Sequence, residues 1–174
     1  MTIETLYEGR FLRLLRSGNW EYVARTNAKG AAFIVAVTDQ RELVMVEQYR
    51  VPLRAQSVEL PAGIIGDEAA HADEPFESAA LRELEEETGF RAGCIEHLVT
   101  GPTAPGMSSE LLHFYLATRL VRIHAGGGVE GENITVHLVP LNGATDWLMA
   151  QMAAGKRCDP RAFVGLWFAQ QRVG

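Results

Sequence analysis

Residues 74–90 read EPFESAALRELEEETGF and form the most informative stretch of the chain. Pro75 suits the first turn of a helix, and Gly89 suits the left-handed residue just past a helix end. The stretch therefore predicts a helix over residues 75–88, preceded by an acidic loop.

Three glutamates of this helix are expected to share one face. At 100° per residue, Glu83, Glu86 and Glu87 fall within an arc of roughly 100°, beside the apolar face that contains Leu84, whereas Glu85 points away. Such like-charge neighbours repel by a few tenths of a kcal/mol each, and they lie near the negative end of the helix dipole. Taken alone, the run is typical of a solvated surface. The alternative is a site for a hard cation, because three carboxylates on one stripe suit Mg²⁺ or Mn²⁺.

Composition narrows the class of protein. The 174 residues are 47% hydrophobic and 22% charged, which excludes a disordered or fibrous chain. A net charge of −6 gives no general footprint for nucleic acid, so any phosphate must be handled locally, with help from a cation. The two cysteines are too few for a disulfide framework and form no zinc pattern. No apolar run approaches the ~20 residues of a membrane span, and the expected location is the cytoplasm.

The remaining pattern predicts a mixed α/β or α+β domain. Strands are expected as two or three short segments within residues 1–30, then at 31–38, 43–50, 58–60, 93–100, 110–120 and 134–139. The strands at 31–38 and 43–50 are expected to pair as a hairpin across the turn at 39–42. Residues 64–74 are expected to form a loop, and the tail is expected to form helices at about 144–154 and 160–171.

The wider string around the predicted helix resembles the signature of the Nudix hydrolases. RELEEETGF at 82–90 matches every specified position of the second half of that signature, and seven residues separate Glu74 from Arg82, as in the family. The first half departs from the family pattern, because ten residues rather than five separate Gly63 from Glu74. An insertion of this size costs a loop little stability, but it lies beside the expected site.

This resemblance implies a metal site and a fold. Glu83, Glu86 and Glu87 would bind Mg²⁺ (or Mn²⁺), with the Ala62 carbonyl as a further ligand. Arg82 and Glu86 would belong to the catalytic set, Arg82 by holding a glutamate in place. The implied architecture is the Nudix fold, a mixed sheet between helices over residues 31–174. Residues 1–30 would add a small antiparallel β annex, which in ADP-ribose-type relatives packs against a second subunit, so a homodimer is expected.

The resemblance also suggests a catalytic base. Residues 105–110 (PGMSSE) are similar to the Pro-Gly-x-Ser-x-Glu stretch of ADP-ribose pyrophosphatases, and Pro105 lies sixteen positions after Gly89, a spacing associated with that subfamily. Glu110 is then the candidate base, Glu132 is the rival, and Glu130 is a weaker choice.

Substrate contacts are expected from several parts of the chain. Gly63 and Pro105 are candidates from the two motifs. Arg50 or Arg54 could clamp a phosphate with its planar fork, although an ordinary surface ion pair explains either equally well. Trp20 and Phe11 resemble the adenine-stacking aromatics of relatives, and the alternative is that they fill a dimer interface.

The implied activity is metal-dependent hydrolysis of the pyrophosphate linkage of a small nucleoside diphosphate derivative. ADP-ribose, giving AMP and ribose 5-phosphate, is the first candidate, and GDP-mannose or another nucleotide sugar is the alternative. A non-catalytic nucleotide sensor on the same fold is a different class. Because such proteins usually lose glutamates that are all present here, an enzyme is the stronger prediction. Neither nucleic acid nor membrane is expected as a partner.

Overall fold

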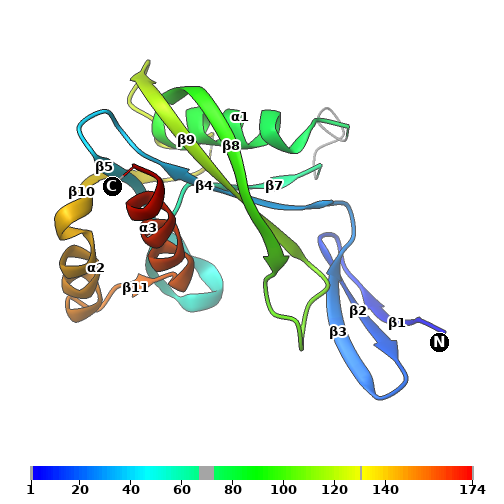
Figure 1. The fold of residues 1–174 in the computed structure, drawn as a ribbon. Coiled ribbons are helices and arrows are strands. Elements are labelled where there is room, and N and C mark those ends of the chain that lie inside the picture. Colours follow the sequence, from blue (N-terminus) through cyan, green and yellow to red (C-terminus); the bar gives the residue numbers. More distant parts are fainter. Residues whose placement is uncertain (1, 67–72, 130, 174) are drawn as a thin grey trace.

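The structure is a computed structural model that describes residues 2–66, 73–129 and 131–173. In these ranges the strands form three sheets, of orders β1-β2-β3, β7-β4-β9-β8 and β10-β5-β6-β11 (Figure 1). The strand bounds are β1 Glu4–Glu8, β2 Leu12–Ser17, β3 Trp20–Arg25, β4 Gly30–Ala36, β5 Glu42–Arg50, β6 Ala55–Glu59, β7 Ala62–Ile65, β8 Phe90–Pro102, β9 Leu111–Arg122, β10 Thr135–Pro140 and β11 Arg157–Cys158. The helices are α1 Phe76–Thr88, α2 Ala144–Ala153 and α3 Pro160–Val173, with 3-10 turns at η1 Val51–Leu53 and η3 Leu141–Gly143. The mixed α and β class predicted from the sequence is confirmed.

Strand β4 is the centre of the fold, because both of its faces are buried. It runs antiparallel to β7 and parallel to β9. Phe33 and Val35 pack with residues of α2 and α3, whereas Ala32 and Ile34, on the opposite face, pack with residues of α1. The sheet therefore lies between α1 and α3, as Figure 1 shows.

The predicted hairpin between β4 and β5 is wrong. Strand β5 pairs with β10 and β6, and within the described ranges its ladder contact with the β4 segment is the isolated bridge between Val37 and Leu43. Both edges of β4 are occupied by β7 and β9, so the turn at 39–42 joins two sheets. The predicted loop at 64–74 is also wrong at its start, because Ile64 and Ile65 belong to β7.

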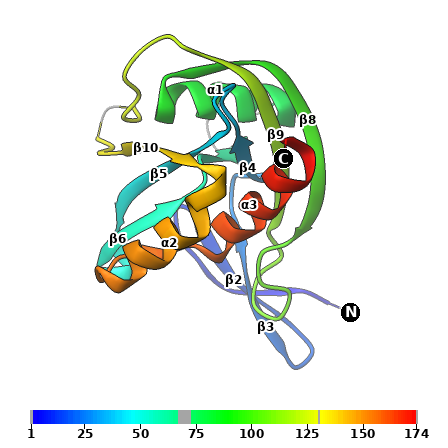
Figure 2. The same cartoon turned by 60° about the vertical axis from the view of Figure 1, so that its left-hand side comes forward.

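The three predicted helices are confirmed to within about two residues at each end. Gly89 has the predicted left-handed conformation (φ 73°), and its N–H donates to the Glu85 carbonyl at 2.8 Å. In Figure 2, α2 and α3 lie side by side, and both contribute to one buried cluster. None of the helices in the described ranges has the length and apolar character needed to cross a bilayer.

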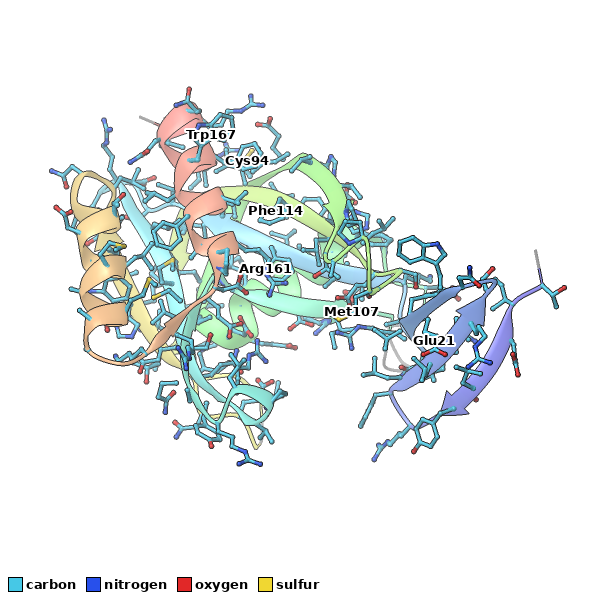
Figure 3. All side chains as sticks on the ribbon, turned by 90° about the horizontal axis from the view of Figure 1, so that it is seen from below. Glu21, Cys94, Met107, Phe114, Arg161 and Trp167 are labelled. Carbon is cyan, nitrogen blue, oxygen red and sulfur yellow. The ribbon has the colours of Figure 1, made fainter. Side chains whose placement is uncertain are left out.

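The N-terminal sheet β1-β2-β3 stands beside the main body and is attached to the loop between β8 and β9. The Val23 N–H donates to the Met107 carbonyl at 2.8 Å, and the Ser109 N–H donates to the Val23 carbonyl at 3.1 Å. Figure 3 shows Met107 at the junction between this sheet and the rest of the molecule. Strand β3 thereby fixes the loop that ends at Glu110.

Candidate active site

A cavity of about 920 Å³ opens beside the glutamate face of α1. Its walls come from strands of all three sheets and from the start of α3. The cavity brings together most of the residues predicted for the site, namely Arg50, Ala62, Gly63, Arg82, Glu83, Glu86, Glu87, Glu110 and Glu132.

Four other predicted residues do not line this cavity among the residues described. Trp20 and Pro105 instead share a second, smaller hollow of about 330 Å³. Phe11 is exposed, and Arg54 lies on the turn after η1. Glu130 falls outside the described residues.

Glu87 is the most buried of the glutamates on this wall, with 5% of its surface exposed. One of its carboxylate oxygens accepts a hydrogen bond from the Ala62 N–H at 3.0 Å. Burial raises the pKa of the Glu87 carboxyl to about 8, the Ala62 N–H opposes this shift, and the charges of Glu83 and Glu132 add to it. The charged form of Glu87 is therefore costly unless a cation accompanies it.

Arg82 holds the neighbouring carboxylates. Its guanidinium lies 3.0 Å from Glu83, 2.9 Å from Glu86 and 3.3 Å from Glu74. Although the spacing between Gly63 and Glu74 is longer than in the family pattern, Glu74 thus still contacts Arg82. Arg82 therefore ties three carboxylates together beside the cavity.

Gly63 is required by close approach rather than by its backbone angles. A Cβ atom at this position would lie 2.0 Å from the Glu83 carboxyl carbon. Only glycine lets β7 pass this close to the helix, so Gly63 determines how near Glu83 lies to the strand.

The carboxyl end of α1 is capped by a glycine loop. The Gly127 N–H donates to the Glu87 carbonyl at 2.9 Å, and the Gly128 N–H donates to the Glu86 carbonyl at 3.1 Å. These donors satisfy carbonyls that a helix end leaves unpaired and oppose its negative dipole. The same loop carries Glu132, whose carboxylate accepts the Val129 N–H at 3.0 Å.

Glu110 also lines the cavity, and it forms an ion pair with Arg25 at the end of β3. Its own N–H donates to the Ser108 hydroxyl at 3.1 Å. The Glu110 side chain is thus fixed by Arg25, which belongs to the N-terminal sheet of the same chain. The Glu110 backbone is fixed by Ser108. Arg25 was not anticipated from the sequence, because its partner lies 85 positions away.

Arg50 lines the cavity but already has an acidic partner. Its Nε and one terminal nitrogen lie 2.9 and 2.6 Å from the two carboxylate oxygens of buried Glu59, and this hydrogen-bonded pairing raises the pKa of Arg50. Three further cavity residues are Arg157 of β11, Asp159 of the link after β11 and Arg161 at the start of α3. They escaped sequence analysis, because β11 has only two residues.

The donor set of the glutamate wall fits a hard divalent cation. Carboxylates and a backbone carbonyl are the ligands such ions prefer. Among the described residues, no three acidic, histidine or cysteine side chains are already gathered around one ion position. The contacts explain this, since Arg82 holds Glu83 and Glu86 while Glu87 is turned toward Ala62. A cation would have to draw these oxygens away from their present partners.

Comparisons with known proteins agree on the family. The model of the NUDIX domain matches residues 28–158. A protein named methanol dehydrogenase activator, from Bacillus methanolicus, is 35% identical over 79% of this chain and 75% of its own length. The ADP-ribose pyrophosphatase of Bacillus subtilis is 43% identical over 52% of this chain and 46% of its own length. The GDP-mannose pyrophosphatase of Citrobacter koseri is 33% identical over 66% of this chain and 61% of its own length.

A solved structure has the same fold over nearly the whole chain. An ADP compounds hydrolase superimposes with a TM-score of 0.73 over 98% of this chain and 91% of its own, at 23% identity. The likeness therefore includes the N-terminal strands, which precede the residues that the domain model matches.

Replacing Glu87 by Gln should stabilise the metal-free protein in a pH-dependent way. Because folding raises this pKa from 4.5 to about 8, the folded state keeps a proton that the unfolded state loses, and stability falls as pH rises across that window. In EDTA, Glu87→Gln should therefore melt above the wild type at pH 8 and close to it at pH 5. Glu85→Gln, which alters a residue paired with Arg91 on the outer face, is the control. A melting-temperature difference that does not change with pH would contradict the assignment.

Proposed function

The chain belongs to the Nudix hydrolase family, which makes it a pyrophosphohydrolase, and we propose that it cleaves nucleoside diphosphate derivatives, with ADP-ribose as first candidate. ADP-ribose would give AMP and ribose 5-phosphate. The observation that carries this proposal is the arrangement of the cavity, in which the glutamates of α1 form one wall and Glu110 approaches from another. This arrangement supports an attack of water on a diphosphate held between them.

The proposed metal ligands are Glu83, Glu86, Glu87 and the Ala62 carbonyl. A bound Mg²⁺ or Mn²⁺ ion would neutralise diphosphate charge and lower the pKa of a coordinated water. Arg82 keeps the carboxylates of Glu83 and Glu86 on the cavity side of the helix, which is a positioning role.

Glu110 is the proposed general base. Its carboxylate lines the cavity, and the Arg25 ion pair and the β3 backbone contacts define its place. A carboxylate so placed can accept the proton of the attacking water, a contribution of about 10²–10⁴-fold in rate. Glu132 lines the same cavity from the capping loop and remains the alternative base.

GDP-mannose is the second candidate substrate, since the GDP-mannose pyrophosphatase named above aligns over a larger share of this chain than the ADP-ribose enzyme does.

We further propose that residues 1–30 form an annex to a Nudix domain of residues 31–174, and that the annex pairs two chains. Large exposed apolar side chains on the annex support this pairing: Ile3, Tyr7, Phe11, Leu12 and Trp20. We also propose that the protein is located in the cytoplasm.

A substrate screen tests the function directly. Release of phosphate, coupled to a phosphatase, would be measured with Mg²⁺ on ADP-ribose, GDP-mannose, NADH, diadenosine polyphosphates and deoxynucleoside triphosphates. The proposal expects the highest kcat/KM for ADP-ribose. A preference for GDP-mannose would exchange the two candidates, and activity only on triphosphates would overturn the substrate class.

Glu86→Gln should reduce kcat by orders of magnitude, because it removes one charged metal ligand and keeps the shape of the side chain. Its stability should stay level or rise, since like-charge repulsion on α1 is relieved. Glu85→Gln is the matched control on the same helix and should keep full activity. Near-normal kcat in Glu86→Gln would remove this residue from the metal set.

Glu110→Gln and Glu132→Gln distinguish the two candidate bases. If Glu110 accepts the proton in the transition state, its variant should lose kcat far more than it gains KM, and Mg²⁺ binding should change little. Glu132→Gln should have the smaller effect on kcat. The reverse order of the two kcat losses would place the base on the capping loop.

Trp20→Ala tests the contribution of the annex to substrate binding. Trp20 is 64% exposed beside Pro105 in the smaller hollow, where a base could stack on it. Loss of one stacking face should raise KM for ADP-ribose by about ten-fold. Trp167→Ala, at an exposed tryptophan of α3 that lines neither cavity among the residues described, is the control.

Light scattering should give twice the 19.1 kDa mass of one chain. A monomer would contradict the proposed pairing of two chains through the annex. An unchanged KM in a dimeric Trp20→Ala protein would leave Trp20 as an interface residue only.

A further inference from the structure

Five arginines line the large cavity, and four of them already have acidic partners. Arg25 pairs with Glu110, Arg50 with Glu59, Arg82 with the α1 carboxylates and Arg161 with Asp159. Within the described part of the chain, the fifth, Arg157, makes neither a side-chain hydrogen bond nor an ion pair. It therefore offers the cavity a guanidinium whose donors are available to a ligand.

The strand register shows that Arg157 does not stand alone. In the β5-β6-β11 sheet, Arg157 pairs with Ser57, and Ser57 pairs with Gln48. Residues paired across neighbouring strands project to the same face of a sheet. Gln48, Ser57 and Arg157 thus form a row, which we call the polar row, and all three line the cavity.

The next residues along the strands face the other way, which fixes the orientation of the row. Val58, paired with Cys158, is fully buried in the cluster beneath α2 and α3. Cys158 also lines the cavity, but its Sγ atom lies 3.5 Å from the Leu148 carbonyl of α2, on the side of that cluster. Like Arg157, neither Gln48 nor Ser57 makes a side-chain hydrogen bond within the described residues. The polar row is therefore a set of three side chains that face the cavity with their hydrogen-bonding capacity unused.

The chemistry of the row suits a phosphoryl group. A guanidinium presents a planar fork of N–H donors that matches two phosphate oxygens, and the amide and hydroxyl beside it can donate to others. Two acids that line the cavity follow the row by two positions, Glu59 after Ser57 and Asp159 after Arg157, and they are paired with Arg50 and Arg161 respectively. The glutamate wall of the cavity can take phosphate only with a cation, whereas the polar row needs none.

We propose that the polar row Gln48–Ser57–Arg157 is a phosphate-binding subsite that holds one phosphoryl group of the diphosphate substrate and of the phosphomonoester product. The proposal rests on the proposed function for the identity of the substrate. It assigns to Arg157 the clamping role that sequence analysis had considered for Arg50 or Arg54.

The test is direct binding without turnover. Calorimetric titration of the protein in EDTA with inorganic phosphate and with ribose 5-phosphate should show binding by the wild type. Arg157→Gln should weaken it about ten-fold or more, which corresponds to the loss of one charge-assisted hydrogen bond. Arg157→Lys should fall between the two, because it keeps the charge but loses the fork. Arg172→Gln, which alters an exposed arginine paired with Glu96, should bind as the wild type does.

Kinetics separates this inference from the proposed function. With the substrate that the screen identifies, Arg157→Gln should raise KM about ten-fold, with kcat within a few-fold of wild type. Phosphate binding that depends on Arg157 in a protein that cleaves none of the screened diphosphates would refute the function and keep the subsite. Hydrolysis with KM and phosphate binding both unchanged in Arg157→Gln would refute the subsite and keep the function.

Two other outcomes would also overturn the proposal. One is a wild type that binds neither phosphate nor ribose 5-phosphate. The other is an equal loss of affinity for uncharged ribose in Arg157→Gln, which would make the row a site for sugar hydroxyls. Because Arg157 is exposed, replacing it should leave the melting temperature unchanged. If Arg157→Gln melted at a much lower temperature than the wild type, the binding comparison would be made with Arg157→Lys.

Discussion

Repulsion among the carboxylates at the end of α1 is the constraint on which the rest of the site depends. Glu83, Glu86 and Glu87 share one face of a single helix near its negative end, which costs free energy before any ligand arrives. Three contacts offset this cost. The positive charge of Arg82 attracts two of the carboxylates, the Ala62 N–H donates to the third, and the glycine loop donates to the exposed carbonyls. Each contact comes from a different element, so the glutamate wall requires β7 and the segment after β9 as well as the helix.

Local signals in the sequence were sufficient for α1 and its cap, because helical periodicity and a left-handed glycine act over a few residues. Strand partners depend on distant segments, and here the prediction failed. The apolar run at 31–36 was recognised as buried, but nothing local says that its edges belong to β7 and β9. A four-residue turn next to two apolar strands is typical of a hairpin, yet in this fold it connects two sheets.

The same limit explains which site residues were found. The glutamates and Gly63 belong to a contiguous motif, and they were identified with Ala62. Arg25, Arg157 and Arg161 enter the cavity only through tertiary structure, from segments far from that motif. Alternation offered no clean signal for the polar row, because polar Glu47 and Gln56 stand directly before Gln48 and Ser57.

The two acids that could serve as base are anchored to different parts of the molecule. Glu110 is held through Arg25 and the β3 backbone, whereas Glu132 belongs to the loop that caps α1. This separation has an evolutionary consequence. Changes in the N-terminal sheet can alter the geometry at Glu110 without disturbing the helix end, and changes in the capping loop can do the reverse. Related proteins with this fold could therefore take the base for proton transfer from either loop, while the glutamates of α1 stay unchanged.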